Sequence, residues 1–473
     1  MKQINRHYIN GQWQPSPSQN TQTLIHGASG AAYAELTLAD ASQAEQAVMA
    51  ARQAFQRWSS TPKDERADAI GRIVAELKAR RDDLVDAIVR ELSCPRWFVE
   101  EIQVDDPIDA FAKHETWTRE LTLSSDKDGV RQQWLAKGVA VLITPWNYPL
   151  HQLVAKVAPA LAAGCTMVVK PSELSPENAL ILAEAIDAAG LPEGVFNLVI
   201  GAGDPVGNAL IQHPEVDVVS FTGSTGVGKA IQQTAASSTK RVCLEMGGKS
   251  PYLIAPTEQL SEAVSLGVED VMLNAGQTCN ALTRMLVHEE QYAEACDFAA
   301  TAADSINIGL PDTPDVVLSA LVSKGQYQKV QRYIELGREE GARQIAGLTP
   351  LPENLEGGYF VRPTVFADVH NQMRIAREEI FGPVLCLIPY SSIDDAIAIA
   401  NDTPFGLSAR VWHDDATEAS RIAGQLRAGQ VYLNQALMRN DVPFGGFKQS
   451  GLGRELGPEG IDEFLELQSV IME

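Results

Sequence analysis

The sequence of 473 residues has no apolar run long enough to cross a membrane. No window approaches the roughly 20 apolar residues that span a bilayer, and residues 1–13 lack the apolar core of a signal peptide. The six cysteines are scattered without paired spacing, which favours neither a disulfide framework nor a zinc site. Internal repeats and low-complexity tracts are also missing. These absences predict a globular cytoplasmic protein without a membrane partner or a metal site.

Positive charge is scarce as well. Lys and Arg total 38 against 61 Asp and Glu, a net charge of −23. Nucleic acids and anionic membranes are bound through an excess of Lys and Arg, so we expect neither as a partner. Hydrophobic residues make up 45% and charged residues 21%, as in ordinary folded proteins. Because a single core rarely grows beyond about 250–300 residues, the chain is expected to form two or more domains.

From Val139 onward, short β-branched runs alternate with alanine-rich stretches of helical spacing. The runs are residues 139–144, 166–170, 195–200, 218–222, 241–245 and 251–254. This alternation predicts parallel βαβ units that bind ligands at the carboxyl ends of their strands. A second α/β section is expected over residues 248–447. The charged, β-prone segment 119–135 is expected to pair with a C-terminal strand, 465–472, as an arm that another subunit can cover.

Cys279 closes the segment 276–279 (GQTC), which follows an apolar helix expected around 260–275. A cysteine in a loop after a helix can be an exposed, activated thiolate, although a lone cysteine is more often buried and structural. Activation needs a base or a positive environment, which the local sequence does not contain. The segment alone therefore leaves both interpretations open.

Two other polar residues follow predicted strands. Glu245 precedes Gly247 and Gly248, where its carboxylate can face a crevice as a general base or can merely cap a turn. Asn147, in the segment 144–149 (TPWNYP), lies at a helix entrance. Its amide could help to hold an oxyanion or could be an ordinary N-cap.

Two segments are suited to a dinucleotide. Lys170 and Glu173 stand at the end of a buried strand, where they could bind ribose hydroxyls or form a surface ion pair. The segment 221–229 (FTGSTGVGK) is a strand, a glycine-rich turn and a helix, and the backbone N–H groups of such a turn suit a pyrophosphate.

These motifs, in this order, resemble the aldehyde dehydrogenase superfamily, in its hydrolytic, non-acylating, NAD(P)-dependent form. The resemblance covers nearly the whole chain and extends through the segments 378–384, 401–407 and 443–451. It implies an α/β fold with a Rossmann-like cofactor domain, an α/β catalytic domain and a small β oligomerisation arm. The implied domains are residues 1–118 with 139–248, residues 249–447, and residues 119–138 with 448–473.

The resemblance also implies catalytic roles. Cys279 would be the nucleophile that forms a thiohemiacetal and then a thioester, and Asn147 with the Cys279 backbone N–H would hold the oxyanion. Glu245 would activate the water that hydrolyses the thioester. Two alternatives are a CoA-acylating semialdehyde dehydrogenase, whose members usually lack the glutamate at position 245, and a non-catalytic structural relative.

NAD is the implied cofactor, because the Glu173 carboxylate would repel the 2′-phosphate of NADP. NADP stays possible. The implied cofactor-binding residues are Thr144, Pro145, Trp146, Lys170, Ser172, Glu173, Gly203, Phe221, Thr222, Gly223, Ser224, Glu245, Gly247, Glu379 and Phe381.

The substrate mouth is expected to be mainly apolar, without an arginine pair for a second carboxylate, although Arg439 lies beside it. The residues expected there are Tyr148, His151, Gln152, Leu273, Thr278, Met438 and Phe444. For His151 the alternative is a helix-surface histidine. A medium aliphatic or aromatic aldehyde is the expected substrate, and the expected assembly is a homodimer or homotetramer.

Overall fold

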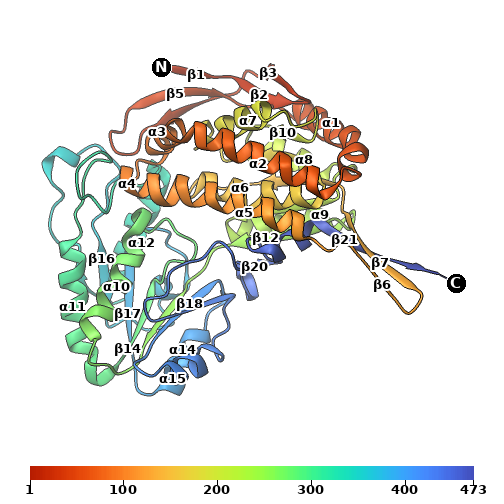
Figure 1. Cartoon of the computed structure of the whole chain (residues 1–473). Helices are drawn as coiled ribbons and strands as arrows, with labels where there is room; N and C mark the ends of the chain where they lie inside the picture. The colour runs from red at the N-terminus through yellow and green to blue at the C-terminus, as the bar shows by residue number, and fades with distance from the viewer. Residues whose placement is uncertain (473) are drawn as a thin grey trace.

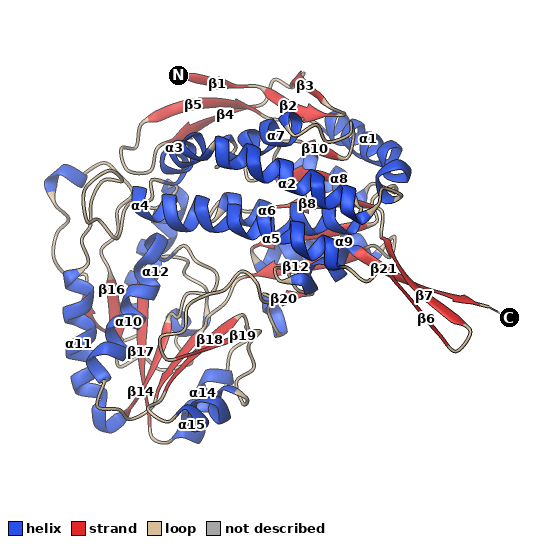
Figure 2. Ribbon diagram, viewed as in Figure 1, coloured by secondary structure: helices blue, strands red, loops and turns tan. Residues whose placement is uncertain are grey.

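The computed structural model describes residues 1–472, and its described part contains four β-sheets with helices packed around the two largest (Figures 1 and 2). Strands and helices alternate along much of the chain, so the predicted α/β class is confirmed. Within residues 1–472 no helix is long and apolar enough to cross a membrane.

The first large sheet has the strand order β20-β12-β11-β8-β9-β10-β2-β3. Its five central strands run parallel and its outer strands β20, β2 and β3 pair antiparallel. The strands are β2 (Arg6–Ile9), β3 (Gln12–Pro15), β8 (Val139–Ile143), β9 (Thr166–Lys170), β10 (Phe196–Leu198), β11 (Val218–Gly223), β12 (Arg241–Met246) and β20 (Gly451–Leu452). Every residue of β8 and β9 is buried, as expected for β-branched strands covered on both faces.

Helices surround this sheet (Figure 2). They are α1 (Ala41–Ser59), α2 (Lys63–Ala79), α3 (Arg81–Leu92), α4 (Arg96–Phe98), α5 (Asp106–Glu120), α6 (Pro149–Ala163), α7 (Glu177–Ala188), α8 (Asn208–Gln212) and α9 (Thr225–Ala236). The apolar helix α6 connects β8 to β9, and α9 connects β11 to β12. Both helices therefore begin at the carboxyl ends of parallel strands, which is where α/β proteins place their ligands.

The second large sheet has the order β15-β16-β17-β14-β13-β18-β19, and only β15 pairs antiparallel within the described chain. Its strands are β13 (Pro251–Ile254), β14 (Arg284–His288), β15 (Arg343–Ala346), β16 (Thr364–Ala367), β17 (Val384–Tyr390), β18 (Ser408–Trp412) and β19 (Gln430–Leu433). Its helices are α10 (Leu260–Met272), α11 (Tyr292–Ser305), α12 (Lys324–Glu339), α13 (Arg374–Arg377), α14 (Ile393–Asn401) and α15 (Ala416–Ala423).

The remaining strands form two small sheets. Near the N-terminus lie β1 (Lys2–Ile4), β5 (Ala32–Thr37) and β4 (Thr21–Ile25). The other sheet, which we call the arm, contains β21 (Leu465–Ile471), β7 (Val130–Ala136) and β6 (Ser124–Lys127), and it projects from the molecule in Figure 1. The two segments expected to pair do pair, although α5 continues to Glu120 and β20 joins the first sheet instead of the arm. The division into domains stays a prediction.

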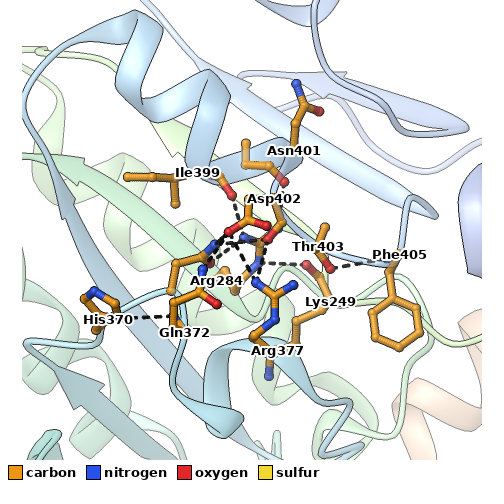
Figure 3. Close-up of polar contacts among 12 residues, drawn as sticks. Lys249, Arg284, His370, Gln372, Arg377, Ile399, Asn401, Asp402, Thr403 and Phe405 are labelled. Carbon is orange, nitrogen blue, oxygen red and sulfur yellow. Dashed lines mark hydrogen bonds and ion pairs between the residues drawn. The ribbon is translucent and has the colours of Figure 1, made fainter.

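A fully buried arginine connects three segments of the second sheet (Figure 3). Arg284, the first residue of β14, donates from Nε to the Lys249 carbonyl at 2.9 Å, and from Nη1 and Nη2 to the carbonyls of Ile399 and Ala400 at 2.9 and 2.8 Å. Nη1 also donates to Asn371 Oδ1 at 3.0 Å. The two helical carbonyls belong to the last turn of α14, whose dipole favours a cation. Burial lowers the pKa of Arg284 to about 10.

Replacing Arg284 with methionine should destabilise the protein strongly. The change removes four hydrogen bonds and leaves their acceptors unpaired, and each unsatisfied buried group costs about 1–3 kcal/mol. We expect the free energy of unfolding to fall by at least about 3 kcal/mol in urea denaturation. Arg421→Met is the matched control, because Arg421 is exposed and pairs only with Glu418, and it should shift the value by less than about 0.5 kcal/mol. Equal effects of the two changes would contradict this role.

Candidate active site

Cys279 is placed in the site by a kink after α10. The helix stops at Met272, earlier than predicted, because Asn274, Ala275 and Gly276 all adopt positive φ angles, of 52°, 53° and 72°. A Cβ at position 276 would lie 2.1 Å from the carbonyl of Gly382, so only glycine fits there. The kink turns the chain so that the Cys279 thiol lines a cavity and is partly exposed.

The turn that follows β8 is hydrogen-bonded to the Cys279 loop. The buried Asn147 amide donates to the Gln277 carbonyl at 3.1 Å, and the Asn147 carbonyl accepts from Asn274 Nδ2 at 2.9 Å. The Tyr148 hydroxyl lies 2.9 Å from Thr278 Oγ1. The first sheet thereby holds its Asn147 side chain against the segment that carries the thiol.

Glu245 is buried and makes no hydrogen bond through its side chain within residues 1–472. Its exposed fraction is 3%. A Cβ at Gly445 would lie 2.6 Å from Glu245 Oε1, so glycine there leaves room for the carboxylate. Burial, and then the charge of Glu455, raise the pKa of Glu245 well above its ordinary value. A carboxyl group with a raised pKa is, once ionised, a stronger base than an ordinary carboxylate.

The Cys279 thiol has a raised pKa for related reasons. Burial raises the pKa of Cys279 to about 12, with additions from the charges of Glu379 and Glu245. The thiol therefore stays protonated at neutral pH unless a base removes its proton. The carboxyl groups of Glu245 and Glu379 therefore lie near enough to the thiol for their charges to raise its pKa.

Lys156 and Glu455 were not identified from the sequence. Lys156, fully buried in α6, forms an ion pair with Glu455 and donates to Thr222 Oγ1 at 2.7 Å. Ser220 Oγ donates to the same Glu455 oxygen at 3.1 Å. Glu455 also lines the cavity with Cys279. The sequence indicated this pair only through the position of Lys156 in a mainly apolar helix, where a buried charge needs a partner.

The residues expected to bind a cofactor gather at the carboxyl ends of β8, β9, β11 and β12. Lys170 is 5% exposed, and its Nζ donates to the Gly201 carbonyl at 2.7 Å and to the Pro171 carbonyl at 3.2 Å. Glu173 Oε2 lies 3.9 Å from Lys170 Nζ. Ser172 follows on the same loop, and the Thr144 N–H donates to the Lys170 carbonyl at 3.1 Å, which joins two of the strand ends.

A glycine-rich turn leads from β11 into α9. Ser224 caps the helix, with its hydroxyl accepting from the Val227 N–H at 3.5 Å. A Cβ at Gly223 would lie 2.5 Å from the Phe221 ring, and one at Gly228 would lie 2.4 Å from Met246 Sδ. The helix N-terminus is thus packed close to the sheet with its N–H groups available for an anion. Gly203, in contrast, has open space around it.

A segment that precedes β17 closes over these strand ends. Glu379 Oε1 accepts from the Gly248 N–H at 3.2 Å, and a Cβ at Gly247 would lie 2.2 Å from that carboxylate. Phe381 packs edge-on against Trp146, with ring centroids 5.6 Å apart. Segments that adjoin both large sheets therefore face one another at the predicted cofactor position. Pro145 lies in the turn after β8, between Thr144 and Trp146.

The predicted substrate residues surround one cavity of about 480 Å³, which also contains Cys279. Its wall includes Tyr148, His151, Gln152, Leu273, Thr278, Met438 and Phe444. His151 is therefore not a surface histidine, and burial lowers its pKa to about 4. Arg439 is absent from the wall and pairs with Asp441 at 2.8 Å. Arg410, which the sequence did not single out, lines the cavity instead.

Comparison with known proteins agrees with this geometry. The family model described as "Aldehyde dehydrogenase family" matches residues 13–470. The chain is 43% identical to 3-succinoylsemialdehyde-pyridine dehydrogenase from Pseudomonas sp., over 100% of this chain and 99% of that protein. The chain therefore belongs to the aldehyde dehydrogenase family and is an aldehyde dehydrogenase.

Solved structures give the same result. A cysteine-to-alanine variant of aldehyde dehydrogenase C from Pseudomonas syringae, in complex with NAD⁺ and octanal, superposes with a TM-score of 0.97 at 42% identity, over 99% of this chain and 96% of that one. Betaine aldehyde dehydrogenase from Staphylococcus aureus, in complex with NAD⁺, gives 0.95 at 32% identity, over 99% and 94%.

Alkylation of Cys279 tests the raised pKa. Because the thiolate reacts and the thiol does not, the rate with iodoacetamide in the cofactor-free protein should rise about tenfold per pH unit between about pH 7 and pH 9. Peptide mass spectrometry measures modification at this position, and Cys279→Ala controls for the other cysteines, which are all buried. A rate that levels off below about pH 8 would contradict the raised value.

Proposed function

We propose that this aldehyde dehydrogenase oxidises its aldehyde to a carboxylic acid through a thioester on Cys279, with NAD⁺ as oxidant. The observation that carries the proposal is the meeting of three groups: a partly exposed thiol in a cavity wall, the Asn147 amide bonded to the neighbouring loop, and a buried, unpaired Glu245. A nucleophile, an oxyanion donor and a base are the parts that covalent acyl chemistry requires.

The residues present fit a dinucleotide. Lys170 and Glu173 would hold the adenosine ribose, the Gly223–Ser224 turn and the start of α9 would hold the pyrophosphate, and Glu379 with Phe381 would hold the nicotinamide ribose. Bound NAD⁺ accepts the hydride that leaves the aldehyde carbon. The Glu173 carboxylate favours NAD⁺ over NADP⁺, and the NAD⁺ complexes of the solved relatives support this choice.

The first step is addition of the Cys279 sulfur to the aldehyde carbon, with loss of the thiol proton to Glu245. An amide has two N–H groups, and that of Asn147 gives one to the Gln277 carbonyl. The other, with the Cys279 backbone N–H, stabilises the oxyanion that forms. Loss of hydride then leaves a thioester.

The second step is hydrolysis. Once the first proton has left Glu245, its carboxylate takes a proton from water, and the resulting hydroxide adds to the thioester carbon. The C–S bond then breaks to give the acid and the Cys279 thiolate, which regains its proton from Glu245. Glu455, close to Glu245 and bonded to Lys156, offers a route by which the proton leaves the buried site. A CoA-acylating enzyme would not need Glu245, so the burial of Glu245 without a partner favours hydrolysis over CoA transfer. The presence of Cys279 argues against a non-catalytic relative.

The cavity suits an aldehyde of medium size. Its volume is about 480 Å³, and Phe98, Leu273 and Phe444 give it an apolar wall near the thiol. An aliphatic chain or an aromatic ring would fit such a wall, and the octanal complex of the Pseudomonas syringae relative supports this substrate class.

We also propose a homodimer or homotetramer assembled through the arm. Strand β21 forms one edge of the three-stranded arm sheet and carries exposed apolar residues, among them Leu467 and Ile471, 51% and 85% exposed. An exposed, apolar edge of this kind is stabilised when another chain covers it.

Kinetics with variants test the mechanism. Wild type should form NADH with a medium aldehyde and release the acid without CoA, and Cys279→Ala should form none. Asn147→Ala should lower kcat by about 10²- to 10³-fold, as expected for one lost oxyanion donor. Glu245→Gln should slow both the first turnover of NADH formation and the steady-state rate, because Glu245 takes the thiol proton in the first step and the water proton in the second.

NADH absorbance and mass spectrometry of the product and of the acyl-enzyme measure these effects. Full activity of Cys279→Ala, or product formation only with CoA, would refute the mechanism.

A further inference from the structure

A charged side chain that the proposed reaction does not use lies in the wall of the substrate cavity. Arg410, in β18, is 5% exposed and lines the same cavity as Cys279. Its neighbours across the sheet are Tyr252 in β13 and Tyr432 in β19, and its guanidinium carbon lies 5.3 Å from the centre of the Tyr432 ring. The side chain is therefore fixed in place by two adjacent strands.

The guanidinium has unused donors. Nη1 donates to the Asn434 carbonyl, and Nη2 has no acceptor among residues 1–472, while Nε is buried out of reach of the cavity. Arg410 forms no ion pair with a carboxylate of residues 1–472, although it lies near enough to Asp270 for its charge to oppose the rise in the pKa of that group. A buried cation with free N–H groups is costly, because water no longer solvates it. A ligand that brings an acceptor into the cavity would remove part of that cost.

The neighbouring acids indicate which acceptor suits the site. Asp270 of α10 lines the same cavity, where its Oδ2 accepts from the Leu282 N–H at 3.1 Å, and Asp106 adds a second carboxyl group to the wall. A substrate carboxylate would be attracted by Arg410 and repelled by both acids. Burial raises the pKa of Asp270, and in its protonated form it would donate to an acceptor as well. A neutral acceptor is compatible with either state of Asp270, whereas a substrate carboxylate is repelled by the ionised state.

We propose that Arg410 determines specificity, and that the substrate is an aldehyde whose far end carries a neutral hydrogen-bond acceptor, such as a ketone or amide carbonyl. The carbon chain between the two groups would contact Leu273, Met438 and Phe444. This inference rests on the proposed function, because it takes Cys279 as the point at which the aldehyde carbon is held.

The test compares heptanal with 4-, 5- and 6-oxoheptanal, which scan the position of the ketone, and with 6-oxohexanoate, which carries a carboxylate. For wild type, kcat/KM for the best ketone should exceed that for heptanal by roughly ten- to a hundredfold, the range of a hydrogen bond to a charged donor. Arg410→Met should abolish this preference and leave heptanal within about threefold, because an apolar substrate does not use the guanidinium.

Arg439→Met is the matched control. Arg439 is an exposed arginine near the cavity that pairs with Asp441 and does not line the wall, so its loss should leave the preference unchanged. Arg410→Lys, which keeps the charge and donors, should retain part of the preference. Continued oxidation of heptanal by both Arg410 variants separates an effect on specificity from misfolding.

Three results would overturn the proposal: equal kcat/KM of wild type for heptanal and every ketone, an equal loss for heptanal and ketones in Arg410→Met, or a preference for 6-oxohexanoate over all ketones. If wild type oxidises none of these aldehydes, the proposed function fails and this inference fails with it. Oxidation of heptanal without discrimination rejects the inference alone.

Discussion

The active site depends on places where the backbone approaches a neighbouring segment too closely for a Cβ atom. Gly276 touches the Gly382 carbonyl, Gly247 touches the Glu379 carboxylate, and Gly445 touches Glu245. Each contact brings together segments that belong to different parts of the chain. Because none of them leaves room for a side chain, the Cys279 thiol, the Glu245 carboxyl group and the Glu379–Phe381 segment can occupy one small volume, and their relative positions are fixed by backbone contact.

Burial then sets the chemistry of these groups. The carboxyl groups of Glu245 and Glu379 and the thiol of Cys279 all have raised pKa values, chiefly because water is excluded from them. Glu245 must be ionised before it can accept the Cys279 proton, and its raised pKa makes the ionised carboxylate a stronger base than an ordinary one, whereas a thiolate beside two ionised carboxylates would be unstable. Lys156, one of the cations near Glu245, is already paired with Glu455.

The sequence indicated the strands of the first sheet well, since runs such as 139–144 and 166–170 correspond to β8 and β9 with ends within one residue. It also selected Cys279, Glu245 and Asn147, although their roles rest on the resemblance to a family. It missed Arg284, Arg410 and the Lys156–Glu455 pair. Each of these depends on partners tens to hundreds of residues away, such as the 299 positions between Lys156 and Glu455, and no local pattern records such contacts. The helix expected to reach residue 275 ended at Met272, because left-handed backbone is set by the packing of the loop.

The chain ends supply strands to sheets that are otherwise built from its middle. Strand β20 pairs with β12 and β21 pairs with β7, over registers such as Gly451 with Glu245 and Leu465 with Ala136. During synthesis β7 and β12 are therefore made long before their partners leave the ribosome. Glu455, the partner of the buried Lys156, arrives equally late. We expect the nascent chain to remain short of its native state until residues 451–471 have left the ribosome, so that the surroundings of Glu245 and the arm are completed late in synthesis.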